Sequence, residues 1–389
     1  MQNSIELFCG AGGLALGLHQ AGFYQHALFE YDKASCENIK SNIITGYTPI
    51  KDRNVIQTDV RDIEYKLYKD IDFVTGGPPC QPFSLGGKHK AYNDARDMFP
   101  EAVRAIRELK PKGFIFENVK GLLRKSFASY FSYIILQLTY PELTKKKDMQ
   151  WADHLEMLEN HHTSNSHMEL KYNVIFRCLN ATDYGVPQMR QRVFIVGFRS
   201  DLNETWSPPS PTHTKEALMY AKHIDNSYWD SHNIAKKDTT TISLDTQYSL
   251  HKYLDGKDIS KRWQTVRDAL TGLPDPTTEI SKVANHRFRS GARTYKGHSG
   301  SVLDEPSKTI KAGAHGVPGG ENTLMLDNGT IRYYTIRECA RLQTFPDNYV
   351  FNGSWTECMR QIGNAVPVKL AQIVGESVTL QLKKHLKVK

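Results

Sequence analysis

The stretch IELFCGAGGLALGLHQAG, residues 5–22, places a short apolar run, a glycine-rich turn and a helical pattern in direct succession. The apolar run ends at Phe8, and Leu14, Leu18 and Ala21 then recur at helical spacing. A strand that passes through glycines into a helix is how a βαβ unit begins. This stretch therefore predicts an α/β fold with a parallel sheet covered by helices.

Further apolar, β-prone runs follow. They are HALFE (26–30), VIQTD (55–59), DFVTGGPP (72–79), GFIFENV (113–119) and, later, VFIVGF (193–198). Glu30, Asp59, Cys80 and Glu117 all fall at or just beyond the C-terminal end of a predicted strand. In an open α/β sheet this edge is where ligands bind, so these four residues are the first candidates for a functional site.

The 389 residues, 39% of them hydrophobic, are enough for two domains with buried cores. After Arg199 the composition changes, and residues 206–330 are rich in Pro, Gly, Ser, Thr and His with little helical periodicity. This predicts a second domain of short strands and long loops, with a boundary near Ser200. Helical patterns return at 335–345 and 369–386, and the last helix is expected to pack back on the first domain. Residues 140–171 are expected to form a surface insertion.

Composition excludes several classes of protein. No apolar run is long enough to span a membrane, and the N-terminus enters a strand-like run at once, so a soluble intracellular protein is expected. The six cysteines are scattered, which argues against a structural zinc site or a disulfide framework. The formal charge of +8 fits a nucleic-acid-binding protein but also many ordinary enzymes.

The glycines of FCGAGG, residues 8–13, allow a ligand to approach the backbone closely, and Glu30 ends the next strand, where an acid can bind ribose hydroxyls. The spacing is not GxGxxG, so a nucleoside without phosphates fits better than a dinucleotide. A structural alternative stays open, because Gly12 or Gly13 can serve only a tight connection that needs a positive φ.

Cys80 lies in GGPPCQPFS, residues 76–84, where prolines stiffen the chain on both sides. It is either a buried packing cysteine or a thiolate nucleophile on a loop at the sheet edge. Glu117 is either a solvated acid or a carboxyl group whose pKa is raised by an apolar wall for proton transfer. In QMRQR, Gln188, Arg190 and Arg192 suggest two guanidinium groups on one side, suited to a phosphate or a carbonyl oxygen, or simply a charged strand entrance.

Six segments occur in the order and wording of one known family. They are IELFCGAGGLALGLHQAGF, GGPPCQPFS, ENVKGLL, YGVPQMRQRVFIVG, RECARLQTFPD and QIGNAVPVKLA. The chain resembles the DNA (cytosine-5) methyltransferase family throughout, apart from residues 140–171 and most of 200–330. The resemblance implies a Rossmann-like sheet of the kind found in S-adenosylmethionine-dependent methyltransferases. It also implies a catalytic and cofactor-binding domain at 1–199 and 354–389, with a smaller, irregular target-recognition domain at 200–353.

The resemblance gives roles to the candidate residues. Cys80 would attack C6 of a cytosine flipped out of the duplex, which activates C5 toward the methyl group. Glu117 would donate a proton to N3, with Asn118 fixing its loop. Arg192 would hold the cytosine O2 and Arg190 would support the same site.

The cofactor implied by the resemblance is S-adenosyl-L-methionine. Its expected contacts are Phe8, Gly10, Gly12, Gly13, Leu14, Glu30, Tyr31, Asp59, Val60, Pro79, Asn364, Ala365 and Val366. Many family members have Ser at the position of Ala365, so the side-chain hydrogen bond of that serine is not expected here.

Double-stranded DNA is the implied substrate, and no metal, membrane or partner chain is expected. The implied DNA contacts are Gln81, Ser84, Arg287, Arg289, Arg293 and Lys296, the last four in a Gly-rich basic segment between His286 and His315. A monomeric, cytoplasmic bacterial enzyme of a restriction-modification system is expected. Alternatives are a tRNA cytosine-5 methyltransferase, an inactive DNA-binding relative and a nicotinamide oxidoreductase, although the last would leave Cys80 and Glu117 unexplained.

Overall fold

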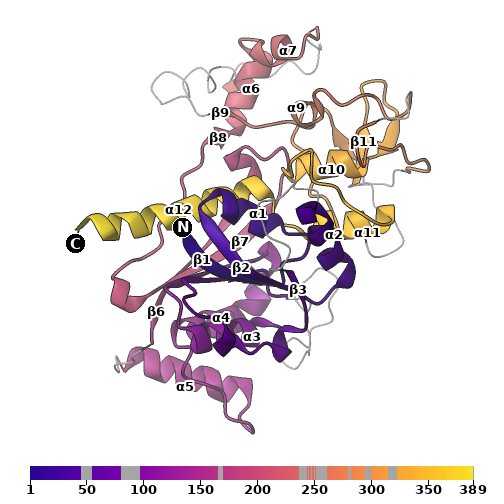
Figure 1. The fold of residues 1–389 in the computed structure, drawn as a ribbon. Helices are drawn as coiled ribbons and strands as arrows, with labels where there is room; N and C mark the ends of the chain where they lie inside the picture. The colour runs from indigo at the N-terminus through magenta and orange to yellow at the C-terminus, as the bar shows by residue number, and fades with distance from the viewer. Residues whose placement is uncertain are drawn as a thin grey trace. The chain divides into compact units, whose positions relative to one another are not determined.

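The computed structural model describes residues 1–44, 55–79, 97–164, 170–235, 243, 245–246, 248, 250, 261–278, 282–293, 299–313 and 322–388. The chain forms two compact units (Figure 1). The first contains residues 1–179, 191–209 and 371–389, and the second contains residues 180–190 and 210–370. The predicted boundaries of catalytic and recognition domains concern function and stay a prediction.

The first unit is built on a seven-stranded sheet of order β3-β2-β1-β4-β5-β7-β6 (Figure 1). The strands are β1 (Gln2–Leu7), β2 (Phe23–Glu30), β3 (Val55–Gln57), β4 (Phe73–Gly76), β5 (Gly113–Val119), β6 (Tyr172–Asn180) and β7 (Gln191–Arg199). Strands β1 to β5 pair in parallel, and β7 runs antiparallel to β5. The strand order reverses between β1 and β4, which is where ligands bind in such sheets. This topology confirms the predicted α/β fold.

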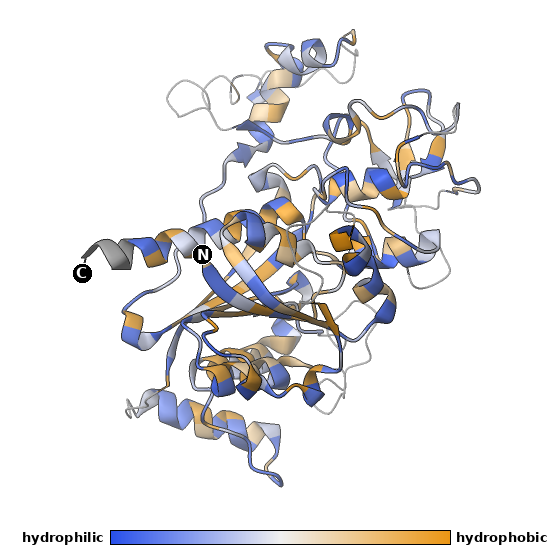
Figure 2. Cartoon of the chain, viewed as in Figure 1, coloured by the Kyte–Doolittle hydropathy of each residue, from blue (hydrophilic) through white to orange (hydrophobic). Residues whose placement is uncertain are grey.

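The central strands are apolar because both faces of the sheet are covered, and Figure 2 shows their hydrophobic colouring. The helices of this unit are α1 (Gly13–Gln20), α2 (Lys33–Ile44), α3 (Phe99–Leu109), α4 (Ala128–Thr139), α5 (Trp151–Thr163) and most of α12 (Val368–Val388). Packing between β5 and β7 is tight, since a Cβ on Gly197 would lie 2.2 Å from Cζ of Phe114. Only glycine fits at this point of the sheet.

Helix α12 packs against α1 and the start of β2, as predicted. A Cβ on Gly375 would lie 2.7 Å from the Ala21 Cβ, so the two helices approach closely. Thr379 Oγ1 donates to the Ala21 carbonyl at 3.1 Å, and Val374 and Val378 are buried. The C-terminal helix therefore completes the core of the first unit.

The segment 140–171 is more than a surface insertion, because its helix α5 packs on α4. Leu158 is buried, and the His154 ring lies between the Tyr133 hydroxyl (2.8 Å) and the Leu143 carbonyl (2.9 Å). Burial lowers the pKa of His154, which keeps the ring neutral in this position. Strand β6, which follows, is not among the predicted strands.

The second unit contains short strands, as predicted, and also helices that are not predicted. The strands are β8 (His213–Thr214), β9 (Lys261–Arg262), β10 (Ser301–Val302), β11 (Thr323–Met325) and β12 (Ile331–Tyr333). The helices are α6 (Lys215–His223), α7 (Ser227–Ser231), α9 (Val266–Leu270), α10 (Ile336–Leu342) and α11 (Trp355–Asn364). Of these, α6, α7 and α9 correct the expectation of strands and loops alone.

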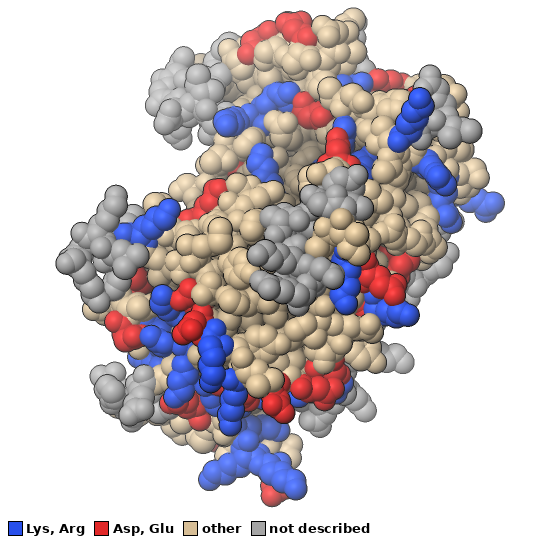
Figure 3. Space-filling model, in the orientation of Figure 1, with Lys and Arg blue, Asp and Glu red and all other residues tan. Residues whose placement is uncertain are grey.

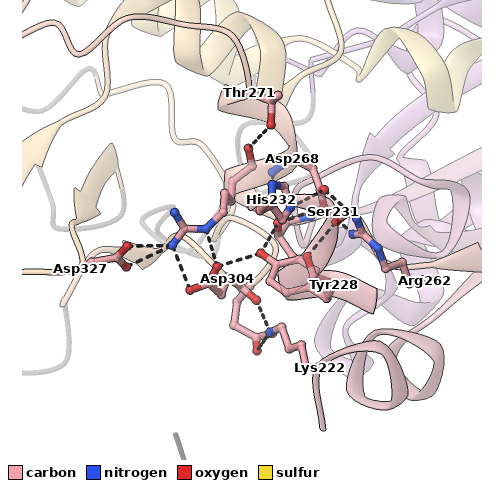
Figure 4. Close-up of polar contacts among 12 residues, drawn as sticks. Lys222, Tyr228, Ser231, His232, Arg262, Asp268, Thr271, Asp304 and Asp327 are labelled. Atoms are coloured by element: carbon pink, nitrogen blue, oxygen red, sulfur yellow. Dashed lines mark hydrogen bonds and ion pairs between the residues drawn. The ribbon is translucent and has the colours of Figure 1, made fainter. Parts of the chain in front are cut away.

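A polar network explains why α6, α7 and α9 form with little apolar periodicity (Figure 4). The Asp304 carboxylate accepts hydrogen bonds from the Tyr228 hydroxyl of α7 (2.8 Å) and from Arg267 Nε of α9 (2.6 Å). Lys222 of α6 donates to the Asp304 carbonyl, and Arg267 also pairs with Asp327 at 2.9 Å. Such long-range contacts leave no periodic signal in the sequence.

Candidate active site

The glycine-rich turn between β1 and α1 has the backbone conformation that its glycines predict. Gly10 (φ 52°) and Gly12 (φ 77°) lie in the left-handed region, and so does Phe8 (φ 57°), where a non-glycine residue is uncommon. A Cβ built on Gly10 meets no atom within 4 Å, so the space beside this backbone is open. The turn therefore presents accessible backbone at the end of β1, beside the strand-order reversal.

Glu30, at the end of β2, holds this turn. Its Oε2 accepts from the Gly10 N–H at 2.8 Å, and its Oε1 accepts from the Asp32 N–H at 2.9 Å. Each carboxylate oxygen keeps capacity for a further hydrogen bond, as two ribose hydroxyls would require. The neighbouring Tyr31 ring is 74% exposed and is available for stacking on a base.

Asp59 caps the short 3₁₀ turn η2 (Val60–Asp62) that follows β3. Its Oδ1 accepts from the Arg61 N–H at 2.9 Å, and the Arg61 guanidinium pairs with the same carboxylate. The hydrogen bonds from Arg61 lower the pKa of Asp59, which keeps it ionised. The neighbouring Val60 side chain is buried.

Glu117, on β5, and Arg192, on β7, form a buried ion pair in which Arg192 Nε lies 2.7 Å from Glu117 Oε1. Burial lowers the pKa of the Arg192 guanidinium, and the nearby Glu117 charge opposes that shift. A Cβ on Gly77 would lie 3.4 Å from the other carboxylate oxygen, so the loop after β4 passes beside this acid. Glu117 therefore has a guanidinium partner that the sequence pattern does not predict.

Asn118 fixes the loop that leads to Cys80. Its Nδ2 donates to the Pro78 carbonyl at 3.0 Å, while its Oδ1 accepts from the Val119 N–H at 2.9 Å. The Pro79 carbonyl accepts from the Met98 N–H at 3.4 Å, so both prolines before Cys80 are tied to described backbone. The predicted residues Cys80, Gln81 and Ser84 lie outside the described residues.

The surroundings of Arg190 differ from those predicted. The side chain is fully buried in the second unit, and its guanidinium donates to the carbonyls of Ile310 (3.0 Å), Gly363 (2.6 Å) and Ala365 (2.9 Å). It therefore joins segments far apart in the sequence, whereas Arg192 pairs with Glu117. The prediction that Arg190 and Arg192 both face one ligand is corrected, because the Arg190 guanidinium donates its hydrogen bonds to backbone carbonyls.

The segment Asn364–Val366 follows α11 and is held by Arg190 and by close helix packing. Asn364 is exposed, while Ala365 and Val366 are buried. A Cβ on Gly363 would lie 2.3 Å from the Ala312 backbone nitrogen. The glycine before Asn364 therefore allows α11 to contact the backbone at residue 312 directly.

Changing Gly363 to alanine should destabilise the protein, because the added methyl group meets backbone that cannot rotate away. Overpacking of this kind costs about 1–3 kcal/mol in the free energy of unfolding. The control is Gly353→Ala in the same unit, where the added Cβ would lie 3.4 Å from Cγ of the flexible Glu357 side chain, although its φ of 114° adds backbone strain. Urea denaturation of both variants checks this, and equal stability of wild type and Gly363→Ala would contradict the packing argument.

The basic segment of the second unit, which begins at His286, is preceded by residues held by hydrogen bonds. The buried Arg337 donates to the Ala284 carbonyl at 3.1 Å, and the His286 ring lies 2.9 Å from Thr335 Oγ1. After His286, the side chains of Arg287, Arg289 and Arg293 are exposed. The guanidinium of Arg289 lies 4.5 Å from the centroid of the Trp355 ring. Lys296 lies outside the described residues.

The face of the molecule drawn in Figure 3 carries charges of both signs. On the face drawn in Figure 3, blue basic and red acidic side chains are interspersed. Within the described ranges, no group of three or more His, Cys, Asp or Glu side chains could hold a metal ion. Across the same residues, no helix combines the length and apolar character needed to span a bilayer.

One residue that the sequence pattern does not single out lies beneath the turn. Glu6, in the middle of the apolar run of β1, is fully buried. The only signal is an acid inside a strand of apolar residues, which many half-exposed strands share. Its burial becomes visible only when β1 is found between β2 and β4.

Comparison with known proteins places the chain in a family. A family model described as C-5 cytosine-specific DNA methylase matches residues 2–140 and 149–379. The Type II methyltransferase M.PspPI of Psychrobacter sp. (strain TA137) is 32% identical over 382 residues, which are 97% of this chain and 79% of that protein. The Type II methyltransferase M.NgoMIV of Neisseria gonorrhoeae is 30% identical over 390 residues, or 98% of each chain.

Solved structures of low sequence identity share the fold. The S. pombe Dnmt2 methyltransferase aligns over 99% of both chains with a TM-score of 0.55 at 18% identity. The Entamoeba histolytica methyltransferase EhMeth aligns over 98% of this chain and 99% of its own, with a TM-score of 0.56 at 14% identity. The resemblance carried by the six sequence segments is confirmed. The chain therefore belongs to the C-5 cytosine-specific DNA methylase family and is a DNA (cytosine-5) methyltransferase.

Proposed function

We propose that this enzyme methylates C5 of cytosine within one short DNA sequence, with S-adenosylmethionine as the methyl donor and Cys80 as the covalent nucleophile. The observation that carries this proposal is the cluster of Glu117, Arg192 and Asn118 beside the chain that enters Cys80. The first two are paired at 2.7 Å, and the third donates to the Pro78 carbonyl. A thiol, an acid and a guanidinium are the groups that cytosine C5 chemistry needs at one place.

The turn and its neighbours fit the donor. Glu30 retains acceptor capacity on both oxygens for the ribose hydroxyls, the exposed Tyr31 ring can stack on adenine, and the backbone near Gly10 is open. Asp59 and Val60 would contact the adenine. Phe8, Gly12, Gly13, Leu14, Pro79, Asn364, Ala365 and Val366 complete the proposed set. When bound, S-adenosylmethionine supplies an electrophilic methyl group on a sulfonium.

The protein's own residues prepare the cytosine. C5 of cytosine is a poor nucleophile, and addition of the Cys80 thiolate to C6 forms an S–C6 bond that makes C5 enamine-like. A proton from Glu117 to N3 prevents negative charge from accumulating on the ring. Once C5 carries the methyl group, a solvent base removes the C5 proton. The C–H electron pair forms the C5–C6 double bond, and the S–C6 pair leaves on sulfur as the Cys80 thiolate, which restores the aromatic ring. Arg192 would hold O2, and the target base must leave the duplex to reach this site.

The ion pair places a condition on this mechanism. A carboxylate paired with Arg192 cannot donate a proton, so Glu117 must be protonated when cytosine is bound. Arg192 then has a donor to spare for the cytosine O2, because its guanidinium carries five N–H groups. Arg190, by contrast, acts through structure, since it holds the chain at residues 310, 363 and 365.

A restriction-modification role is the biological setting that we propose. M.PspPI and M.NgoMIV carry Type II methyltransferase names and are similar to this chain over nearly its whole length. The DNA sequence that the enzyme recognises can be read from the positions of methylated cytosines in a plasmid. Bisulfite sequencing of plasmid incubated with enzyme and donor should show methylated cytosines in one short context only. Methylation in every context, or none, would contradict a sequence-specific DNA enzyme.

The basic segment is the proposed DNA reader. Arg287, Arg289, Arg293 and Lys296 would be changed to alanine one at a time, and at least one variant should methylate near-cognate sites. Loss of a base contact costs about 1–3 kcal/mol and relaxes discrimination at one position, whereas loss of a phosphate contact weakens binding to every sequence alike. Because Arg289 is held on Trp355, Arg287 and Arg293 are the favoured readers.

Bisulfite sequencing would count the extra methylated positions for each variant. Arg177→Ala, which removes an exposed arginine from β6, is the control for loss of charge alone. If all four variants lose DNA affinity uniformly and keep the site preference, the segment only contacts the backbone. The reading residues would then lie elsewhere between 200 and 330.

A further inference from the structure

Glu6 occupies an unusual place for a carboxyl group. It lies in β1, with its neighbours in register being Leu28 on β2 and Thr75 on β4, and its exposed fraction is 0%. The Thr75 hydroxyl lies 3.4 Å from its Oε2, and the Ala15 N–H also donates to the carboxyl group. Its Oε1 has no hydrogen-bond partner among the described residues.

The contact with Ala15 substitutes for a missing helix cap. Helix α1 has Gly12 at its N-cap, and glycine has no side chain to accept from the first orphan N–H groups. Ala15 is the third residue of the helix, and its N–H is one that an N-cap side chain ordinarily satisfies. Glu6 of β1 supplies that acceptor, so its carboxyl group stabilises the first turn of α1 and the glycine turn before it.

The surroundings of Glu6 decide its charge. Glu30 from β2 is the charged group that acts on Glu6, and Thr75 of β4 is neutral. Cys9 lies in the turn and is itself affected by Glu6, Glu30 and Cys36 of α2. Burial, with a smaller contribution from Glu30, raises the pKa of Glu6 to about 8. Burial also raises the pKa of both thiols, so neither adds a charge near neutral pH.

Two carboxyl groups on adjacent strands therefore have different surroundings. Glu30 accepts hydrogen bonds from two backbone N–H groups, whereas Glu6 lies in a dry environment. We propose that Glu6 is a positioning residue for the donor-binding turn, acting as an uncharged acid that caps α1 beside the turn that Glu30 holds. This inference rests on the proposed use of S-adenosylmethionine.

Ionisation of Glu6 would disturb the glycine-rich turn and so weaken binding of the donor. A second carboxylate would repel Glu30 and would demand solvation that the buried site cannot give, so the turn through Phe8 and Gly10 would have to move. Donor affinity should then fall as the pH rises past about 8. Glutamine in place of Glu6 keeps an acceptor for the Ala15 N–H and cannot ionise, so it mimics the neutral acid.

The experiment measures binding of S-adenosylhomocysteine, which lacks the reactive sulfonium, by calorimetry between pH 6.5 and 9. The wild type should bind about tenfold more weakly at pH 9 than at pH 7, because about one molecule in ten keeps a neutral Glu6 one unit above its pKa. Glu6→Gln should bind like the wild type at pH 7 and lose this alkaline fall. Glu6→Ala should bind about tenfold more weakly at pH 7, which is about 1.4 kcal/mol, because it removes both the acceptor for the Ala15 N–H and the support of the turn.

Glu37→Gln is the control, because Glu37 is exposed on α2 and pairs with Lys33 at 3.6 Å. It should keep the wild-type pH dependence. An equal alkaline fall in wild type and Glu6→Gln, or no fall in the wild type, would overturn the inference. Failure of the wild type to bind the nucleoside at any pH would instead overturn the proposed donor.

Thermal unfolding without ligand gives an independent readout. Folded Glu6 keeps its proton up to about pH 8, but in the unfolded chain it loses it near the ordinary value of 4.5. The folded state thus binds more protons in this window, so the contribution of Glu6 to stability falls as the pH rises through it. The melting temperature of Glu6→Gln should rise relative to wild type between pH 5 and pH 8. A constant difference would overturn the inference even if the variant bound no nucleoside.

Discussion

Replacement of Cys80 by serine should abolish methyl transfer while DNA binding survives. An alcohol is far less acidic than a thiol and is a poorer nucleophile, so addition to C6 would not proceed at a measurable rate. Serine is close to cysteine in size, so the substitution changes the chemistry of the side chain more than its volume. Turnover is measured with labelled donor, and binding to the same duplex is measured by gel shift.

A suicide substrate separates this mechanism from a merely structural role of Cys80. On DNA that carries 5-fluorocytosine at the target, the wild-type enzyme should remain covalently attached, because fluorine cannot leave C5 as a proton does. The adduct should resist denaturation, and Cys80→Ser should form none. Active wild-type enzyme that gives no adduct would contradict covalent catalysis by this cysteine.

Glu117→Gln should lower turnover by roughly 100-fold, the usual scale for loss of an acid catalyst. Glutamine fills the same space and can accept from Arg192, but it has no acidic proton for N3. Affinity for the donor should barely change, because Glu117 pairs with Arg192 beside the loop at Gly77, whereas the turn at Gly10 is held by Glu30. Single-turnover kinetics under donor saturation would measure the chemical step.

The exposed Glu37→Gln variant is again the control, and its turnover should equal that of the wild type. If Glu117→Gln retained full turnover while chemistry limits the rate, another group must supply the proton. A fall in donor affinity without a change in turnover would instead indicate that Glu117 supports the fold of the site.

Much of the first unit could be predicted because its signals are local. An apolar run, a glycine turn and a helical pattern lie within eighteen residues at 5–22, and β5 is recognisable from GFIFENV alone. Strand β6 has a weaker apolar pattern in the sequence, because its middle residues Phe176 and Arg177 are exposed and need not both be apolar. Helices α6 and α7 depend on contacts such as Tyr228 to Asp304, which join residues 76 positions apart.

In the candidate site, too, residues marked by a local pattern could be predicted, whereas roles that depend on long-range contacts could not. Glu30, Glu117 and Asn118 could be predicted from their places at strand ends, and the structure gives each a contact that fits a site at this edge. The two arginines of QMRQR could not be told apart by spacing. Arg190 is structural because carbonyls more than a hundred residues away converge on it.

The most direct test of the account is the fate of a labelled methyl group. The enzyme would be incubated with methyl-labelled S-adenosylmethionine and either duplex DNA or tRNA, and the nucleic acid would be digested to nucleosides. A sequence-specific DNA (cytosine-5) methyltransferase should leave label in 5-methyldeoxycytidine from the duplex and none in tRNA. Label in the tRNA alone, in another deoxynucleoside, or in neither nucleic acid would contradict it.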